Sequence, residues 1–139
     1  MEKRIETVEG FTVYGFEMEG AADQIPALWD KLNAALCDND IQAGVSFGIT
    51  MKIENDGFHY MAGVSAEEAA RLPDATSLIV PGGRFIVGRV DGGIEMIPAM
   101  FDTLMQTPDI DMRDSYGFER YIHPDPKKPY ETEVWVPID

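Results

Sequence analysis

Cysteine, histidine and long apolar runs are scarce in this chain of 139 residues, and each scarcity excludes a class of protein. The single cysteine, Cys37, can form neither an internal disulfide nor a thiolate metal cluster. The two histidines, His59 and His123, lack the spacing of a metal site. No segment is long and apolar enough to span a membrane, and no apolar run follows the early basic residues as in a secretory signal. The sequence therefore predicts a cytoplasmic protein without a metal.

Basic residues are also few, at 11 lysines and arginines against 25 acidic residues, which gives a net charge of −14. This field repels nucleic-acid phosphates and attracts cations, although dispersed acidic residues also serve solubility alone. The chain has no phosphate-binding loop, no dinucleotide fingerprint and no nucleophile elbow. We therefore expect no direct contact with nucleic acid, no cofactor and no catalytic residue.

An internal duplication is the main feature that the chain does have. The stretch IPALWDKL, residues 25–32, recurs as IPAMFDTL, residues 97–104. Each copy begins an amphipathic helix with one apolar stripe, and its proline falls in the first turn, where no hydrogen bond is lost. Asp23 is expected to cap the first helix.

Strand-like segments flank the two expected helices in the same order. Residues 12–19 and 84–91 precede them, residues 45–53 and 115–122 follow, and residues 58–64 and 132–138 close each half. A further strand is expected at residues 77–80, between the halves. The pattern predicts an α+β fold in one domain, residues 1–139, built from two pseudo-symmetric strand-helix-strand-strand repeats at about 10–66 and 76–139. We expect the helices on one face of an antiparallel sheet and a groove between the repeats on the other.

The stretch SYGFERYI, residues 115–122, breaks the symmetry of the duplication. Glu119 corresponds to Thr50 in the first copy, and strand alternation places Glu119 and Tyr121 on one face with Arg120 on the other. A charge present in only one copy suggests that Glu119 faces a pocket. Alternation alone leaves a second interpretation open, in which Glu119 is exposed and pairs with a neighbour such as Arg89 or Lys52.

Six stretches in order, VSFGITMKI, GFHYMAGV, PGGRFIVGRVDG, IPAMFDTL, SYGFERYIHP and EVWVPI, carry a family resemblance. The chain resembles the GyrI-like small-molecule-binding domain, also found as the effector-binding domain of AraC-type and MerR-type multidrug-responsive transcription regulators. The resemblance runs from about Gly10 to the last residue. It implies a stand-alone effector-binding domain. Because only a short polar segment precedes the first expected strand, we expect no helix-turn-helix, and DNA binding would come from a protein partner.

The resemblance also implies a groove that accepts bulky lipophilic cations, with its acidic residue in the strand that reads FERY, which is Glu119 here. It implies aromatic walls, and the corresponding positions are Phe47, Tyr60 and Tyr121. Trp135 on the last strand and the adaptable side chain of Met61 complete the candidate ligand-binding set.

The expected function is non-covalent binding of lipophilic, cationic small molecules. A carboxylate in an apolar groove is costly unless a cation pairs with it, and aromatic faces add cation–π attraction. One alternative is a hydrolase of electrophilic cytotoxic compounds, with Glu119 as general base and Glu17 or Glu133 as a second acid. Another is a regulatory module that binds a protein partner such as DNA gyrase or a DNA-binding subunit.

Overall fold

The computed structural model describes residues 3–41, 44–54, 57–65, 72, 74–90, 96–108, 110–113, 115–122 and 131–139. The elements in chain order are β1 (Lys3–Val8), β2 (Phe11–Gly20), the 3-10 turn η1 (Ala22–Gln24), α1 (Ile25–Asp38), β3 (Val45–Glu54), β4 (Gly57–Ser65), β5 (Thr76–Val80), β6 (Gly83–Val90), α3 (Ile97–Met105), β7 (Gly117–Ile122) and β8 (Glu131–Ile138). This order confirms the α+β class and the duplicated arrangement of strands around a helix.

The strands form one antiparallel sheet in the order β1-β6-β8-β7-β3-β4-β2-β5. The hairpins β3–β4 and β7–β8 come from different repeats and meet where β3 pairs with β7, with Gly48 opposite Glu119. The axis of the pseudo-symmetry therefore passes between β3 and β7, so residues near this seam can form a site shared by both repeats.

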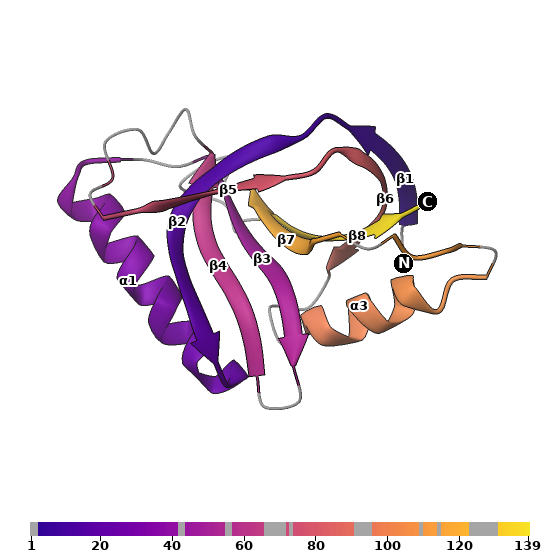
Figure 1. Cartoon of the computed structure of the whole chain (residues 1–139). Helices are drawn as coiled ribbons and strands as arrows, with labels where there is room; N and C mark the ends of the chain where they lie inside the picture. The colour runs from indigo at the N-terminus through magenta and orange to yellow at the C-terminus, as the bar shows by residue number, and fades with distance from the viewer. Residues whose placement is uncertain are drawn as a thin grey trace.

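Two long ribbons tie the halves together. The strand β1 continues into β2 and β5 continues into β6, and because β1 pairs with β6 while β2 pairs with β5, both ribbons run from one half to the other (Figure 1). The ribbons touch where they turn: a Cβ atom at Gly82 would lie 2.5 Å from the backbone nitrogen of Gly10. Only glycine allows this approach of the two backbones.

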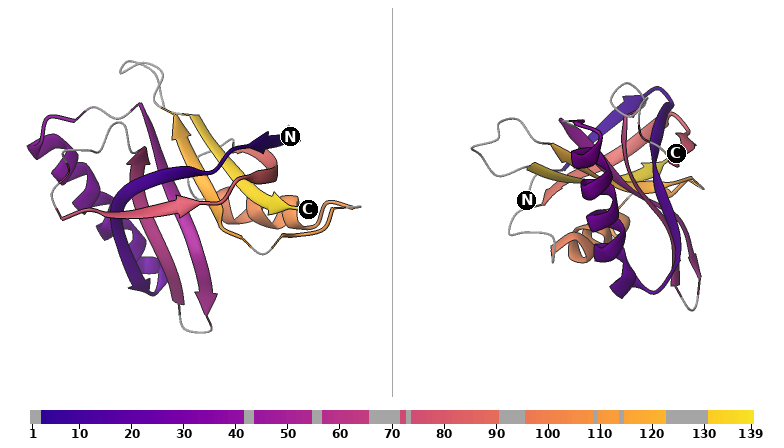
Figure 2. Two further views of the ribbon diagram at one scale, coloured as in Figure 1. Left: turned by 45° about the horizontal axis from the view of Figure 1, so that its top comes forward. Right: turned by 90° about the vertical axis from the view of Figure 1, so that its left-hand side faces the viewer.

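Each helix covers one half of the sheet, as the two views of Figure 2 show. From α1, Leu28, Leu32 and Leu36 are buried in a cluster with Tyr60 of β4. From α3, Met100 and Leu104 are buried in a separate cluster with strands β6 and β8. Both helices begin with a proline, as expected. The expected cap is wrong, because η1 precedes α1 and places Gln24, without a side-chain cap bond, at the position assigned to Asp23.

The helix-free face of the sheet curls around a core of its own. Its largest members are rings whose neighbouring centroids lie 5.2–5.9 Å apart, with Phe118 and Trp135 stacked at 14°. These rings belong to Phe11, Phe47, Phe85, Phe118 and Trp135. Aromatic burial of this kind is a large source of apolar stabilisation.

The edge strand β1 is the element that the sequence analysis missed. The sequence analysis describes the segment before the first expected strand only as short and polar, and three of the side chains in KRIETV are charged. Pairing with β6 forms the strand, and an edge position tolerates charged side chains. The strand expected at residues 77–80 is confirmed as β5.

Candidate functional site

A cavity of about 710 Å³ lies between the two helices and over the seam of the repeats. Equivalent residues of the duplication line it in pairs: Ile25 and Ile97 at the helix starts, and Thr50 and Glu119 on the strands. Phe101 and Met105 of α3 add apolar wall. The walls are mainly apolar, with Asp102 and Arg113 as the charged lining residues besides Glu119, and the cavity volume lies within the range typical of small-molecule sites.

Glu119 lies at the strand side of this cavity and is 7% exposed. Its Oε1 atom accepts hydrogen bonds from the hydroxyls of Tyr60, at 2.9 Å, and Tyr121, at 3.4 Å. Its buried Oε2 atom has no hydrogen-bond partner among the residues that the structure describes. The arrangement therefore leaves half of the carboxylate without a partner next to an apolar cavity.

Gly48 makes room for this contact. A Cβ atom at this position would lie 1.9 Å from the Tyr60 hydroxyl oxygen and 2.9 Å from Oε1 of Glu119. Gly48 corresponds to Gly117 in the second copy, where a Cβ atom would approach its nearest neighbours only to 3.4 Å. Glycine is therefore sterically required at this position in the first copy, because there the Tyr60 hydroxyl and the Glu119 carboxylate lie where a Cβ atom would be.

Trp29 of α1 extends the polar contact to the helix. Its indole nitrogen donates to the Tyr60 hydroxyl oxygen at 3.1 Å, and its ring meets the Tyr121 ring edge-on at 5.2 Å. The Tyr60 hydroxyl therefore accepts from Trp29 and donates to Glu119. The sequence analysis did not include Trp29 in the site. The exchange of Trp29 for Phe101 between the two helix copies was the signal for it.

Burial raises the pKa of Glu119 to about 7, and the hydrogen bonds from Tyr60 and Tyr121 oppose this rise only in part. Burial also raises the pKa of Tyr60 well above its ordinary value, helped by the nearby Glu119 carboxylate. Near neutral pH, Tyr60 is therefore a neutral hydrogen-bond donor, and Glu119 exchanges between a neutral and a charged form.

The structure separates the six candidate residues into two groups. Glu119 and Tyr60 line the cavity between the helices, and Tyr121 contacts both Glu119 and Trp29. Phe47, Met61 and Trp135 lie in the aromatic core of the helix-free face. Strand alternation explains the division, because Phe47, Met61 and Trp135 each adjoin in sequence a residue that faces the helices.

This arrangement corrects the expected position of the groove. The sequence analysis placed one groove, with all six residues, on the helix-free face. The structure has a hollow on each face, and the larger one, with Glu119, lies on the helix side. A smaller cavity of about 300 Å³ on the helix-free face has Phe47 and Trp135 in its lining, whereas Met61 is fully buried and lines neither.

Among the described side chains, the alternative ion-pair partner and the second acids proposed from sequence do not contact Glu119. Arg89 pairs with Glu131 at 3.6 Å, and the side chain of Lys52 lies outside what the structure describes. Glu17 lies near His59, at 3.9 Å, on a more exposed part of the sheet. Glu133 is buried on the helix-free face with Arg4. His123 lies outside the described residues.

Two kinds of feature are absent from the described ranges. Those ranges hold no helix with the length and apolarity needed to cross a membrane. They also hold no group of three or more acidic, histidine or cysteine side chains suited to a metal ion.

The fold and its seam cavity define the class of protein: a duplicated α+β domain with a ligand-sized hollow between its repeats. Residues 4–138 match the family model Cass2, described as integron-associated effector binding protein, and the chain belongs to this family. The match and the structures below confirm the resemblance to GyrI-like effector-binding domains. No curated protein matches the chain.

Three solved structures share the fold at low sequence identity. SAV2435 bound to tetraphenylphosphonium is 17% identical with a TM-score of 0.76, covering 100% of this chain and 94% of that one. The Cass2 integron cassette protein from the mobile metagenome of Vibrio cholerae is 16% identical with a TM-score of 0.73, covering 99% and 95%. The C-terminal domain of EcmrR is 10% identical with a TM-score of 0.72, covering 99% and 97%. At these identities the likeness establishes the fold alone.

Proposed function

We propose that the protein binds lipophilic, singly charged cations non-covalently in the cavity between α1 and α3, with Glu119 as the charge-selecting residue. The observation that carries this proposal is the buried Oε2 atom of Glu119, which has no partner among the described residues and borders an apolar cavity. The family's description as effector binding and the tetraphenylphosphonium bound to SAV2435 support the same ligand class.

The energetics favour a cation that carries its own apolar surface. A desolvated carboxylate costs several kcal/mol, and a bound cation offsets this cost by direct attraction in a medium of low polarity. Apolar groups of the ligand contribute roughly 25 cal/mol per Å² buried, and faces of aromatic rings add about 0.5–2 kcal/mol each. Tyr60 and Phe101 supply such rings in the cavity wall. Few directed hydrogen bonds are involved, so the specificity should be broad.

The test is calorimetric titration with tetraphenylphosphonium and with triphenylphosphine oxide, a neutral compound of related shape. The wild-type protein should prefer the cation, and Glu119→Gln should weaken cation binding at least tenfold, which is about 1.4 kcal/mol, while changing the neutral compound little. Glu131→Gln is the matched control, because Glu131 is about half exposed on the neighbouring strand and does not line the cavity. Equal affinity of both compounds for wild type and Glu119→Gln would contradict the proposal.

We also propose that ligand binding takes place in the cytoplasm and that a protein partner supplies any DNA binding. This chain spans 57% of the EcmrR chain in its DNA complex, so the rest of that regulator lies outside the match. A pull-down with and without tetraphenylphosphonium tests the partner. Recovery of one DNA-binding protein in a ligand-dependent amount would support it, and recovery that ignores the ligand would oppose it.

A further inference from the structure

We infer a second binding site, for small aromatic anions such as an arene carboxylate, in the cavity on the helix-free face of the sheet. This second cavity has a volume of about 300 Å³ and is separate from the one that contains Glu119. The inference rests on the charge of its lining and on the rings around it, and it is independent of the proposed cation binding.

Arg120 is the one charged residue in the lining of the second cavity. Most of the other lining residues are apolar or aromatic, and they include Phe47, Phe118 and Trp135. A guanidinium has five N–H donors in a planar fork that matches a carboxylate. The one ion pair described for Arg120 is a 3.7 Å contact with Glu133, and its side chain is 34% exposed. Its remaining donors are thus available to a ligand.

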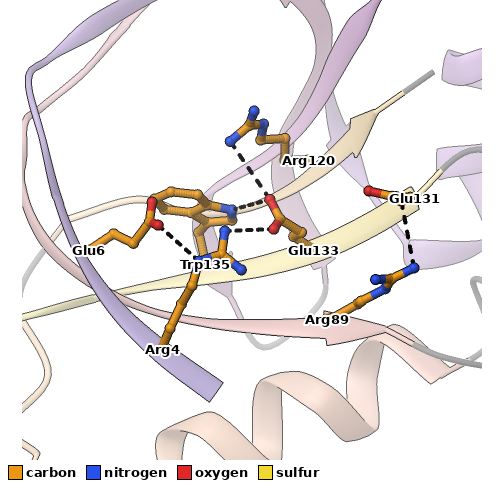
Figure 3. Close-up of polar contacts among 7 residues, drawn as sticks. All are labelled: Arg4, Glu6, Arg89, Arg120, Glu131, Glu133 and Trp135. Carbon is orange, nitrogen blue, oxygen red and sulfur yellow. Dashed lines mark hydrogen bonds and ion pairs between the residues drawn. The ribbon is translucent and has the colours of Figure 1, made fainter. Parts of the chain in front are cut away.

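Other groups bind Glu133 more closely than Arg120 does. Its Oε2 atom accepts a short hydrogen bond of 2.6 Å from Arg4, and its Oε1 atom accepts one from the Trp135 indole at 3.3 Å. Figure 3 shows Glu133 between these two donors and Arg120. Arg4 also pairs with Glu6 at 2.9 Å, so the two arginines and two glutamates balance in charge, and what Arg120 offers a ligand is the N–H donors that its 3.7 Å contact with Glu133 leaves unused.

The aromatic lining determines the body of the ligand. Trp135 stacks on Phe118, and Phe118 meets Phe47 edge-on at 5.9 Å, so a planar ring placed in the cavity would lie against a cluster of aromatic rings. The guanidinium of Arg120 lies 5.9 Å from the centre of the Trp135 ring. A flat ring beside Trp135 would therefore bring its carboxylate within reach of Arg120. The volume suits one or two fused rings.

The two cavities would then select ligands of opposite charge on opposite faces of one sheet. Glu119 and Arg120 are neighbours on β7, and strand alternation turns one toward the helices and the other away from them.

The test uses the full-length, ¹⁵N-labelled protein and 2-naphthoate, with neutral 2-naphthylmethanol as the matched ligand. The chain has two tryptophans, so each indole N–H gives its own signal. We expect naphthoate to shift the Trp135 indole signal along a saturable curve, to leave the Trp29 signal in place, and to bind more tightly than naphthylmethanol. Equal affinity of the two compounds, or a shift of the Trp29 signal alone, would overturn the inference.

Variants of the two arginines sharpen the test. Arg120→Gln should weaken naphthoate binding at least tenfold, whereas Arg89→Gln should leave it unchanged, since Arg89 also pairs with a glutamate of β8 but does not line the cavity (Figure 3). Arg120→Lys keeps the charge and should retain a preference for naphthoate over naphthylmethanol, even if the glutamine variant does not fold. Loss of that preference in the lysine variant, or unchanged binding in Arg120→Gln, would overturn the inference. Glu119→Gln should bind naphthoate as wild type does, which separates this result from the cation test.

Discussion

At the scale of single residues, Glu119 makes the stability of the protein depend on pH. Burial raises its pKa from an ordinary value of 4.5 to about 7, so the folded state binds the proton more tightly than the unfolded state. Its contribution is therefore fully present in acid, below the ordinary pKa, and is lost as pH rises through about 7. The free energy of unfolding of wild type should fall by up to about 3 kcal/mol relative to Glu119→Gln between about pH 4 and pH 8.

Urea denaturation of both proteins across this pH range measures the difference directly. Glu131→Gln serves as the control, because Glu131 is about half exposed and its removal should change the free energy of unfolding by less than about 0.5 kcal/mol. A constant difference between wild type and Glu119→Gln at all pH values would contradict the assignment of Glu119 as a buried, proton-exchanging group.

Gly48 provides a second test at this scale. In Gly48→Ala the new methyl group would overlap the Tyr60 hydroxyl, so we expect a loss of about 1–3 kcal/mol of stability and a broken contact between Tyr60 and Glu119. In a Tyr60→Phe background the same change should be milder, because the hydroxyl that it displaces is gone. Gly117→Ala is the matched control, since its methyl group would meet its neighbours at ordinary contact distance. Equal losses for Gly48→Ala in both backgrounds would contradict the proposed steric role.

Glu119 was easier to single out from the sequence than the residues that the structure places around it. Glu119 was found because it breaks the internal duplication. A charge that is present in only one copy does not belong to the packing that the two copies share. Phe47 was included because the family resemblance implies aromatic walls, Met61 because its side chain is adaptable, and Trp135 because it lies on the last strand. The face of each strand depends on register, and register is fixed by long-range pairing such as Gly48 with Glu119, which one sequence does not reveal.

At the scale of secondary structure, one tryptophan reports on each face of the sheet. Trp29 of α1 belongs to the hydrogen-bonded group around Glu119, and Trp135 of β8 belongs to the helix-free face. Tetraphenylphosphonium bound next to Glu119 should therefore change the emission of Trp29. Fluorescence titration of Trp135→Phe should keep most of the wild-type signal change, and Trp29→Phe should lose most of it. The reverse result would place the cation on the helix-free face.

The edge strand β1 illustrates why some elements escape a sequence analysis. Its polar sequence gives no clear period, and its place in the sheet depends on β6 and on the contact of Arg4 with Glu133. The amphipathic helices and the central strands were predicted because each carries its own apolar pattern. A strand without such a pattern, such as β1, forms because of its tertiary contacts, and the sequence alone therefore does not predict it.

Removal of the Arg4 contact should therefore loosen β1. In Arg4→Gln the buried carboxylate of Glu133 loses its shortest hydrogen bond, and we expect a loss of about 1–3 kcal/mol together with faster amide exchange in β1. Hydrogen exchange of residues 3–8 measures this effect. Arg89→Gln removes a more exposed ion pair from the neighbouring strand and should leave exchange in β1 unchanged, so a comparable increase in that variant would contradict the role of Arg4.

At the scale of the whole molecule, two sources of negative charge act on a cationic ligand. The net charge of −14 produces a long-range field, and Glu119 supplies one buried carboxylate at the site. Salt and pH distinguish them. At about 0.1 M salt or more, the attraction of exposed charges for a ligand decays within a screening length of about 10 Å or less, whereas a buried pair is little affected. Protonation removes the charge of Glu119 below a pH of about 7, where most exposed carboxylates stay ionised.

The affinity of wild type for tetraphenylphosphonium should therefore fall about tenfold per pH unit below about pH 7, and level off above it. Raising salt from about 0.05 to 0.5 M should weaken binding only a few-fold, since the buried pair is poorly screened. Glu119→Gln should lose the pH dependence and keep the salt dependence, because the surface field is unchanged. Calorimetry in two buffers of different ionisation enthalpy would also detect the proton released on binding. If salt abolished wild-type binding and Glu119→Gln had no effect, the acidic surface would be attracting the cation, and the cavity between the helices would have no part in binding it.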